Sequence, residues 1–384
     1  MGEYSTRPGT PDARLIVAAS DTDANLLWAT GMFAPDPFIF IRKGRRQYLV
    51  MNDLEVDRAR EQASVDRVLH QTEYVRRVQS RGIPFPTMTQ VIEAVFEELG
   101  IRGARVPFDF PLGIADGLRA SGIRVEVQPE PFWPEREIKR EDEVRKIRAS
   151  LKAAEAGMEA GIEALRRTRI TRQGFLTLDG ARLTSEILKS IINRTIMGRG
   201  YVPSHTIVSS GEQAVDPHNE GSGPIRAHTS VIMDIFPRSQ TTGYFGDMTR
   251  TVVRGRASEA LKRAYTAVLE AQRIGFRRIR PRASAFEIHS EILEYFRGRG
   301  FETGLRNGRM QGFFHGTGHG LGLDIHEAPS FGSRARNRFR KNHVVTVEPG
   351  LYYPGMGGVR LEDVVLVTDN GCRNLVRFPK YLEV

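Results

Sequence analysis

Two apolar segments near the C-terminus each carry a carboxylate at one end. Glu348 ends the strand-like segment VVTVE, and Glu362 stands just before the strand-like run VVLV. Burying a carboxylate among apolar side chains is costly unless a counter-charge lies nearby. The chain must therefore fold so that positive charge reaches both carboxylates. For Glu362 an ordinary salt bridge would be enough, so these two residues alone leave the source of that charge open.

Asp363 follows Glu362 directly, yet the two cannot serve the same site. Successive side chains of a strand point to opposite faces of the sheet. We choose Glu362 for the site, because its face also presents Arg360.

The segment VIMDIFPRSQTTGYFGDMTRTVV predicts an antiparallel hairpin with an aspartate on each arm. If Asp234 and Asp247 lie opposite each other, the turn centres between Gln240 and Thr241, and both carboxylates project from one face. Like charges in direct cross-strand contact repel, so the pair also predicts a positive group between them. Taken by itself, the segment is equally compatible with two unrelated acids near a loop.

The segment FFHGTGHGLGLDIHEAP holds three of the nine histidines of the chain, His315, His319 and His326. A single histidine is more often structural than functional. Glycine on both sides of His319, however, indicates close approach by backbone or ligand. We therefore predict that His319 is a metal ligand.

Together these segments supply four carboxylates and one imidazole, which is the ligand set of a two-metal centre. Two divalent ions would balance four carboxylates and could hold one bridging hydroxide. An oxygen-rich shell with one nitrogen and no sulfur favours Mn²⁺, with Co²⁺ and Zn²⁺ as alternatives. The predicted ligands are Asp234, Asp247, His319, Glu348 and Glu362.

The first third of the chain alternates strand-like and helix-like segments, among them a hairpin pattern at 38–51, which is typical of an α/β domain. A proline-punctuated link at 129–134 then leads into a charged, alanine-rich segment with helical spacing. Farther on, helices and strands occur in separate runs, as in α+β folds. We predict a smaller α/β domain at residues 1–135 and an α+β domain at residues 136–384. The helices predicted in the second domain are 140–168, 179–194, 256–274 and 284–298.

Composition limits the remaining possibilities. With 40% hydrophobic and 27% charged residues, no long apolar run and no signal-peptide layout, we expect a soluble cytoplasmic protein that does not bind membranes. The single cysteine, Cys372, excludes an intramolecular disulfide and a multi-cysteine zinc site. The net charge of +10 would suit a nucleic-acid surface, but no block of five like charges occurs, so we expect no specific nucleic-acid partner.

The five predicted ligands lie within DIFPRSQTTGYFGDMTRTVV, HGTGHGLGLDIHE, TVEPGLYY and VRLEDVVLV, and their order resembles the pita-bread metallopeptidases. That family includes Xaa-Pro aminopeptidases, Xaa-Pro dipeptidases (prolidases) and methionine aminopeptidases. The segment NLLWATGMFAPDPFIFI resembles the N-terminal domain of the proline-specific and creatinase branch, which methionine aminopeptidases lack. The resemblance implies a C-terminal pita-bread domain, a smaller creatinase-like α/β domain before it, and hydrolysis of the Xaa-Pro bond at peptide N-termini.

The resemblance also implies a role for each ligand. Asp234 would chelate one ion, and Asp247 and Glu362 would bridge the two ions. His319 and Glu348 would complete the coordination of the second ion. A water activated by both ions would attack the carbonyl, and Glu348 would carry its proton to the departing nitrogen.

Four further residues match family positions around the metals. His218, in VDPHNEGSG, matches a histidine that faces the substrate, and His326 matches one near the scissile carbonyl. His315 and Arg360 match positions that support the metal shell. The two aspartates lie 13 positions apart where 11 is common in the family. Because the number of added residues is even, both aspartates stay on the same face of the hairpin. We therefore expect the ligand positions to be kept while the loop becomes longer.

The alternatives to an Xaa-Pro aminopeptidase are an Xaa-Pro dipeptidase, a metal-free creatinase-like amidinohydrolase and a catalytically silent binding module. A dipeptidase must recognise a carboxylate one residue beyond the scissile bond, and in some family dipeptidases an arginine follows the histidine-Glu-x-Pro segment. Ser330 occupies that place here, with Arg334 and Arg336 downstream, so we favour the aminopeptidase. A metal-free creatinase-like amidinohydrolase and a catalytically silent binding module typically lose ligands that this chain keeps. We expect a proline-containing peptide as substrate and a homodimer as the assembly.

Overall fold

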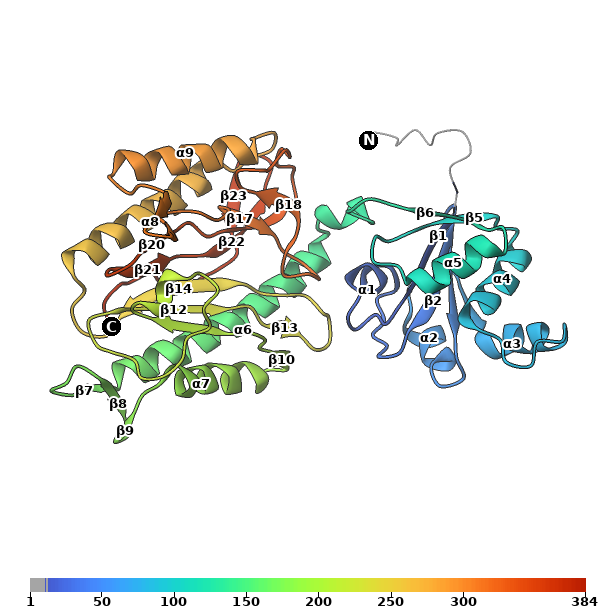
Figure 1. Cartoon of the computed structure of the whole chain (residues 1–384), viewed down its shortest axis with the longest axis horizontal. Helices are drawn as coiled ribbons and strands as arrows, with labels where there is room; N and C mark the ends of the chain where they lie inside the picture. Colours follow the sequence, from blue (N-terminus) through green and yellow to red (C-terminus); the bar gives the residue numbers. More distant parts are fainter. Residues whose placement is uncertain (1–10, 12) are drawn as a thin grey trace. The chain divides into compact units, whose positions relative to one another are not determined.

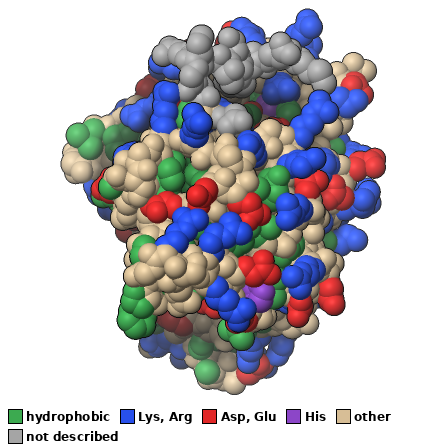
Figure 2. Space-filling view, turned by 90° about the vertical axis from the view of Figure 1, so that its right-hand side faces the viewer, with side chains coloured by type: hydrophobic (Ala, Val, Ile, Leu, Met, Phe, Trp, Pro, Cys, Tyr) green, Lys and Arg blue, Asp and Glu red, His purple; other side chains and the backbone are tan. Residues whose placement is uncertain are grey.

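The computed structural model describes residue 11 and residues 13–384. The chain divides into two units, residues 1–136 and 137–384, which Figure 1 colours from blue to red along the sequence. In the part of the chain that the structure describes, no helix is long and apolar enough to cross a membrane. On the face drawn in Figure 2, Lys and Arg side chains are interspersed with Asp and Glu side chains.

The first unit is built on a six-stranded sheet in the order β4-β3-β2-β1-β5-β6. Strands β1, β2 and β3 pair antiparallel, and the other neighbours pair parallel. The strands are β1 (Ala13–Ala18), β2 (Phe38–Lys43), β3 (Arg46–Met51), β4 (Arg67–His70), β5 (Gly103–Val106) and β6 (Arg124–Val127). The helices are α1 (Ala24–Thr30), α2 (Val56–Gln62), α3 (Gln71–Gln79), α4 (Met88–Leu99) and α5 (Leu112–Ala120).

This sheet has a hydrophobic core on each face. Leu15 and Val17 of β1 join the core that contains residues of α3, α4 and α5, whereas Ile16 joins the core with residues of α1 and α2. The period-2 alternation of strand side chains thus divides one apolar strand between two cores. Helices on both faces make this unit a three-layer α/β domain, as the alternating sequence pattern predicts.

The second unit places helices outside two antiparallel sheets (Figure 1). One sheet has the order β11-β12-β14, and the other has the order β18-β17-β19-β22-β23. Their strands are β11 (Ile207–Ser210), β12 (Ser230–Ile235), β14 (Met248–Val253), β17 (Gly318–Gly320), β18 (Glu327–Phe331), β19 (Val344–Val347), β22 (Asp363–Val367) and β23 (Cys372–Asn374). The pair β20 (Gly350–Tyr353) and β21 (Gly357–Arg360) packs against both β12 and α8.

Four long helices cover these sheets, and each corresponds to a predicted one. They are α6 (Glu141–Arg166), α7 (Ser185–Met197), α8 (Glu259–Arg278) and α9 (Ala285–Gly298). Helix α6 packs against α7, β12 and β14, and α8 packs against α9 and β19. Helix α7 begins six residues after its predicted start, because the preceding residues form a small sheet of β7 (Arg169–Ile170), β8 (Leu176–Leu178) and β9 (Ala181–Arg182). Helices and strands lie in separate runs, so the α+β prediction is confirmed for this unit.

Four further short strands and a 3₁₀ helix belong to the second unit. Strands β10 (Tyr201–Val202) and β13 (Arg238–Ser239) pair with each other, as do β15 (Gly304–Arg306) and β16 (Arg309–Gln311). A short 3₁₀ helix covers Gln213–Val215.

Candidate metal centre

The two aspartates lie on one face of the β12–β14 pair but are not directly opposite each other. Asp234 pairs in register with Thr249, and Asp247 comes just before β14. The prediction of direct opposition is therefore wrong by two positions, an even shift that keeps both carboxylates on the same side. The cause is the connection between the strands: it forms β13, which pairs with β10, and its Phe245 N–H donates to Gly322 O at 2.8 Å.

His319 is held on β17 by close backbone contacts. A Cβ atom at Gly318 would lie 2.1 Å from Thr346 O, and one at Gly320 would lie 2.4 Å from Ala328 O. Neither position tolerates a side chain, so the predicted close approach of backbone around His319 is confirmed. The His319 N–H also donates to Thr346 Oγ1 at 3.0 Å.

Glu348 directly follows β19, the strand that pairs with β17. Its N–H donates to Thr317 O at 2.8 Å, and its Oε1 accepts a hydrogen bond from Thr346 Oγ1 at 3.1 Å. His319 Nε2 lies 3.2 Å from the same Oε1. The threonine hydroxyl and the imidazole together fix the orientation of this carboxylate.

Glu362 and Asp363 separate as alternation predicts. Glu362 Oε2 accepts a hydrogen bond from Thr249 Oγ1 at 2.7 Å and faces the aspartates. Asp363 points elsewhere and accepts from Arg250 Nη2 at 2.8 Å and from Lys380 Nζ at 2.5 Å. Asp363 is thus fully engaged in a buried ion-pair cluster of its own.

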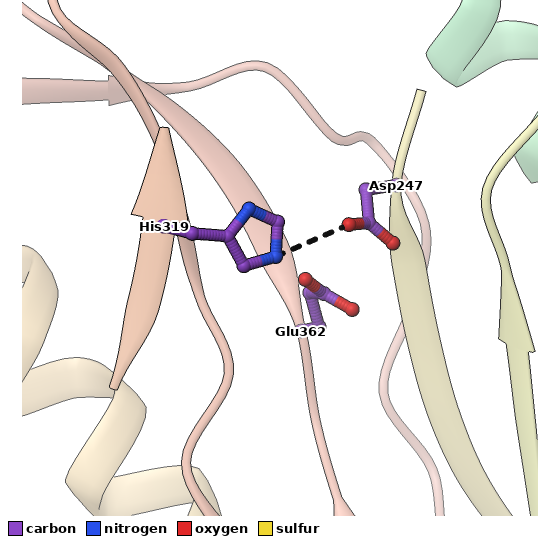
Figure 3. A group of neighbouring side chains, drawn as sticks. All are labelled: Asp247, His319 and Glu362. Atoms are coloured by element: carbon purple, nitrogen blue, oxygen red, sulfur yellow. Dashed lines mark ion pairs between the residues drawn. The ribbon is translucent and has the colours of Figure 1, made fainter. Parts of the chain in front are cut away.

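Three of the predicted ligands meet at one point. One ligand atom each of Asp247, His319 and Glu362 lies within 4.8 Å of the others, and Figure 3 shows their carboxylates and imidazole turned toward one another. His319 Nε2 is 3.6 Å from Asp247 Oδ2. Asp234 and Glu348 line the same cavity of about 650 Å³. All five predicted ligands therefore border one space.

The charges around this space are unbalanced without a cation. Burial and the charge of Asp234 raise the pKa of Asp247 well above its usual range, and burial and the charge of Asp247 do the same for Glu362. Asp234 Oδ1 and Glu362 Oε1 are buried without a hydrogen-bond partner among the residues described. Two orphaned carboxylate oxygens beside crowded acids are the donors that a divalent cation requires, so the residues fit a metal centre.

His319 and Glu348 form a hydrogen-bonded pair in which each residue shifts the pKa of the other. Burial alone would lower the pKa of His319, but its hydrogen bond to Glu348 and that residue's charge raise it to about 9. Burial alone would raise the pKa of Glu348, but His319 lowers it to about 2. Glu348 is accordingly a carboxylate at neutral pH.

Arg360 is the buried cation beside Asp234. Its Nη2 donates to Asp234 Oδ2 at 2.7 Å, and its Nη1 donates to the Tyr352 hydroxyl at 2.9 Å. That hydroxyl also lies 3.0 Å from His315 Nε2. Burial lowers the pKa of His315 to about 4, so its ring is neutral at neutral pH. Arg360 and His315 thus meet at Tyr352 behind the carboxylates.

The remaining two predicted residues lie on the open side of the cavity. His218 and His326 are both exposed lining residues, and the His326 ring centroid is 4.3 Å from that of His319. A second pair at the rim, His205 and Glu220, has Nδ1 and Oε1 2.8 Å apart. His205 has φ 52°, an unusual backbone angle that the sequence does not signal.

Several residues that position the site are not predicted by the sequence patterns. Thr249, Thr346 and Tyr352 each contact a predicted ligand or its support. The available signal was a polar side chain within an otherwise apolar strand, as in VVTV and LYY. Five apolar side chains also line the cavity: Ile207, Pro217, Phe236, Phe314 and Ile325.

His289 supports the site from α9 and predicts a pH dependence of stability. Its Nδ1 lies 2.9 Å from Thr317 Oγ1, and burial lowers its pKa to about 4. Because the unfolded chain binds this proton near its ordinary pKa of about 6.5, the free energy of unfolding should fall as the pH drops from about 6.5 toward 4.

The variant His289→Asn keeps an amide near the Nδ1 position but does not titrate. Urea unfolding of chelator-treated protein at about pH 7 and about pH 5 should show a smaller acid-induced loss in the variant than in the wild type. Equal losses in both proteins would contradict a neutral, buried His289.

Comparison with known proteins agrees with this geometry. The model of metallopeptidase family M24 matches residues 145–369. An uncharacterized peptidase of Bacillus subtilis, YqhT, is 36% identical over 177 residues, 46% of this chain and 47% of that protein, so the chain spans about half of this relative. An Xaa-Pro dipeptidase of Pyrococcus horikoshii is 28% identical over 317 residues, 81% of this chain and 83% of that protein.

A solved structure extends the likeness to both units. The prolidase from Pyrococcus horikoshii OT3 superposes with a TM-score of 0.78 at 25% sequence identity, covering 97% of this chain and 95% of that one. The expected pita-bread fold is thereby confirmed. The matched residues 145–369 contain all five predicted ligands and more than half of the sequence. The chain therefore belongs to metallopeptidase family M24.

Proposed function

We propose that this protein is a metal-dependent exopeptidase that hydrolyses the Xaa-Pro bond at peptide N-termini. The observation that carries the proposal is the convergence of four carboxylates and one imidazole on one cavity, where two buried carboxylate oxygens have no hydrogen-bond partner among the described residues. Membership of a metallopeptidase family supports it. In this proposal residues 137–384 form the catalytic domain, and residues 1–136 form the creatinase-like domain.

The five ligands would hold two divalent ions, for which we propose Mn²⁺, with Co²⁺ and Zn²⁺ as alternatives. Bound ions would supply Lewis-acid chemistry and make water more acidic. The ligands in this proposal are Asp234, Asp247, His319, Glu348 and Glu362. Their four carboxylates face one buried guanidinium, that of Arg360, in the part of the cavity lining that the structure describes.

Three side chains would act on the substrate. Glu348, whose pKa is about 2, is ionised and can take the proton of the attacking water and pass it to the departing proline nitrogen. His326, beside His319, would donate a hydrogen bond to the developing oxyanion. His218 would contact the peptide from the exposed side. His315 and Arg360 would keep Asp234 and Tyr352 in place.

The walls of the cavity suit a proline ring. An Xaa-Pro bond has no N–H, so a site that recognises it relies on apolar contact with the ring rather than on a backbone hydrogen bond. Phe236, Phe314, Ile207 and Ile325 supply such surface beside the ligands. This arrangement supports an Xaa-Pro substrate over a general peptide.

The lack of an uncommitted Lys or Arg side chain among the described lining residues favours an aminopeptidase. A dipeptidase needs a cation for the free carboxylate of the proline, but Arg360, the one Lys or Arg side chain among the described lining residues, is already bound to Asp234 and Tyr352. Ser330, Arg334 and Arg336 are not among the lining residues. Xaa-Pro dipeptidase stays the second candidate, because similar proteins carry that name.

We further propose that the assembly is a homodimer.

The test compares a Gly-Pro dipeptide with an Xaa-Pro-Yaa tripeptide, using purified protein loaded with Mn²⁺. We expect kcat/KM for the tripeptide to exceed that for the dipeptide by about tenfold or more, because an unpaired carboxylate in the cavity would cost about 1.4 kcal/mol or more. Turnover confined to the dipeptide would select the dipeptidase. Failure of metal-loaded protein to cleave either peptide would refute the proposed function.

A further inference from the structure

Positive charge is concentrated in the second unit. Residues 137–384 contain 39 Lys and Arg against 27 Asp and Glu, whereas residues 1–136 contain 17 against 19. Two segments of the second unit, RRIRPR at 277–282 and RARNRFRK at 334–341, hold nine basic residues and no acid.

The fold joins these two segments, which lie more than 50 positions apart. The Arg282 N–H donates to Phe339 O at 2.8 Å, and the Phe339 N–H donates to Ala283 O at 2.9 Å. Arg338 Nη1 donates to Arg282 O at 2.9 Å. Residues 282–285 and 337–339 therefore pair, and this pairing brings the arginines of the two segments together.

Burial alternates along the second segment. Ala335 and Phe339 are buried in the core beneath α8 and α9, whereas Arg334, Arg336 and Arg338 are exposed. Arg280 and Arg282 of the first segment are also exposed. We call these five arginines the arginine ridge. The ridge therefore gathers five exposed guanidinium groups beside the paired backbone of 282–285 and 337–339.

The ridge is not neutralised by the protein, unlike its surroundings. Arg277 pairs with Glu270 at 2.8 Å, Arg278 with Glu291 at 2.9 Å and Lys341 with Asp369 at 2.8 Å. No ridge arginine forms an ion pair with any residue that the structure describes. Arg340, which acts on the pKa of Glu137, is left out of the ridge for that reason. Like charges along paired backbone cost stability, so an external anion would be favoured here.

We propose that the arginine ridge binds the phosphate backbone of single-stranded nucleic acid without regard to sequence. Guanidinium groups form paired hydrogen bonds with phosphate oxygens, and a cluster of five exposed arginines suits a polymer of phosphates. An aromatic ring beside the arginine ridge supports single strands in particular.

Phe286 is 46% exposed and follows Ala285, whose N–H donates to Asn337 O at 3.3 Å, so a base can stack beside the phosphates. A membrane-binding face would need several apolar side chains. Within 277–286 and 334–341, Phe286 is the one large hydrophobic residue that is strongly exposed.

The test measures fluorescence anisotropy of a labelled oligothymidylate of about 20 nucleotides with the full-length protein, between about 50 and about 200 mM salt. The variant Arg280→Gln, Arg334→Gln, Arg336→Gln should lower the slope of log Kd against log salt by about 2, because each phosphate contact with a single strand contributes about 0.7. A second variant, Phe286→Ala, should weaken binding about fivefold or more.

A matched control removes the same charge from elsewhere in the second unit. Arg172, Arg199 and Arg306 are exposed and form no ion pair with a described residue, and their triple glutamine variant should keep the wild-type slope. An equal change of slope in both triple variants, or no change in either, would overturn the proposal. So would duplex DNA binding as tightly as the single strand with no effect of Phe286→Ala, or binding to vesicles containing phosphatidylserine without binding to the oligonucleotide. Circular dichroism verifies that each variant is folded.

Discussion

Replacing Glu362 with alanine is expected to abolish metal binding and to lower kcat/KM on an Xaa-Pro-Yaa tripeptide by about 10³-fold or more. Glu362 is 2% exposed, its Oε1 has no hydrogen-bond partner in the described structure, and its Oε2 is held by Thr249. Under the proposed function, removing this carboxylate takes away one of the four carboxylates that would hold the metal ions. A metal ion supplies several kcal/mol of transition-state stabilisation, which corresponds to the expected loss.

Metal content and hydrolysis are measured together on purified protein, the first by mass spectrometry of the metal and the second by release of the N-terminal residue. Glu302→Ala is the matched control, because Glu302 is exposed and does not line the cavity. It should retain both metal and activity. Undiminished cleavage of the tripeptide by the Glu362 variant would defeat the two-metal assignment.

The neighbouring substitution, Asp363→Ala, is expected to act on stability instead. Asp363 is fully buried and bonds Arg250 and Lys380, and Arg250 is itself 2% exposed. Removing the carboxylate leaves the buried Arg250 guanidinium and the partly buried Lys380 ammonium without their counter-charge. Breaking such a pair costs about 3–5 kcal/mol in the free energy of unfolding.

The positions of the tryptophans make it possible to assign this loss of stability to one unit. Both tryptophans, Trp28 and Trp133, lie in residues 1–136, so tryptophan fluorescence reports on the first unit, whereas circular dichroism reports on both. In urea titrations the Asp363 variant should shift the transition seen by circular dichroism much more than the fluorescence transition. Glu294→Ala, which breaks an exposed pair with Arg297, should change stability by about 1 kcal/mol or less. A similar small effect of Asp363→Ala would show that the buried cluster is dispensable.

Rules that depend only on neighbouring residues predict part of the site from the sequence. The cost of burying a carboxylate singled out Glu348 and Glu362, and strand alternation separated Glu362 from Asp363. Both rules are local, and the structure places these residues accordingly. The fold class followed in the same way, from alternating segments in the first unit and separate runs in the second.

The rest depends on contacts between distant segments. The sequence predicts that Asp234 and Asp247 lie on the same face of the strand pair. It does not predict their register, because the connection between them pairs with β10 rather than closing a simple hairpin. Tyr352 has its role through Arg360 and His315, which approach it only in the folded chain. The arginines of 277–282 and 334–341 likewise look scattered in the sequence, and backbone pairing unites them.

The glycines beside His319 bear on how an ion is captured. The carbonyl groups of Thr346 and Ala328 leave no room for a Cβ atom at Gly318 and Gly320, so the position of this strand is sterically fixed. The imidazole is consequently oriented during folding, and little conformational freedom is left to lose when a cation arrives. The slow part of loading should then be the ion shedding its own hydration shell, not a rearrangement of the polypeptide.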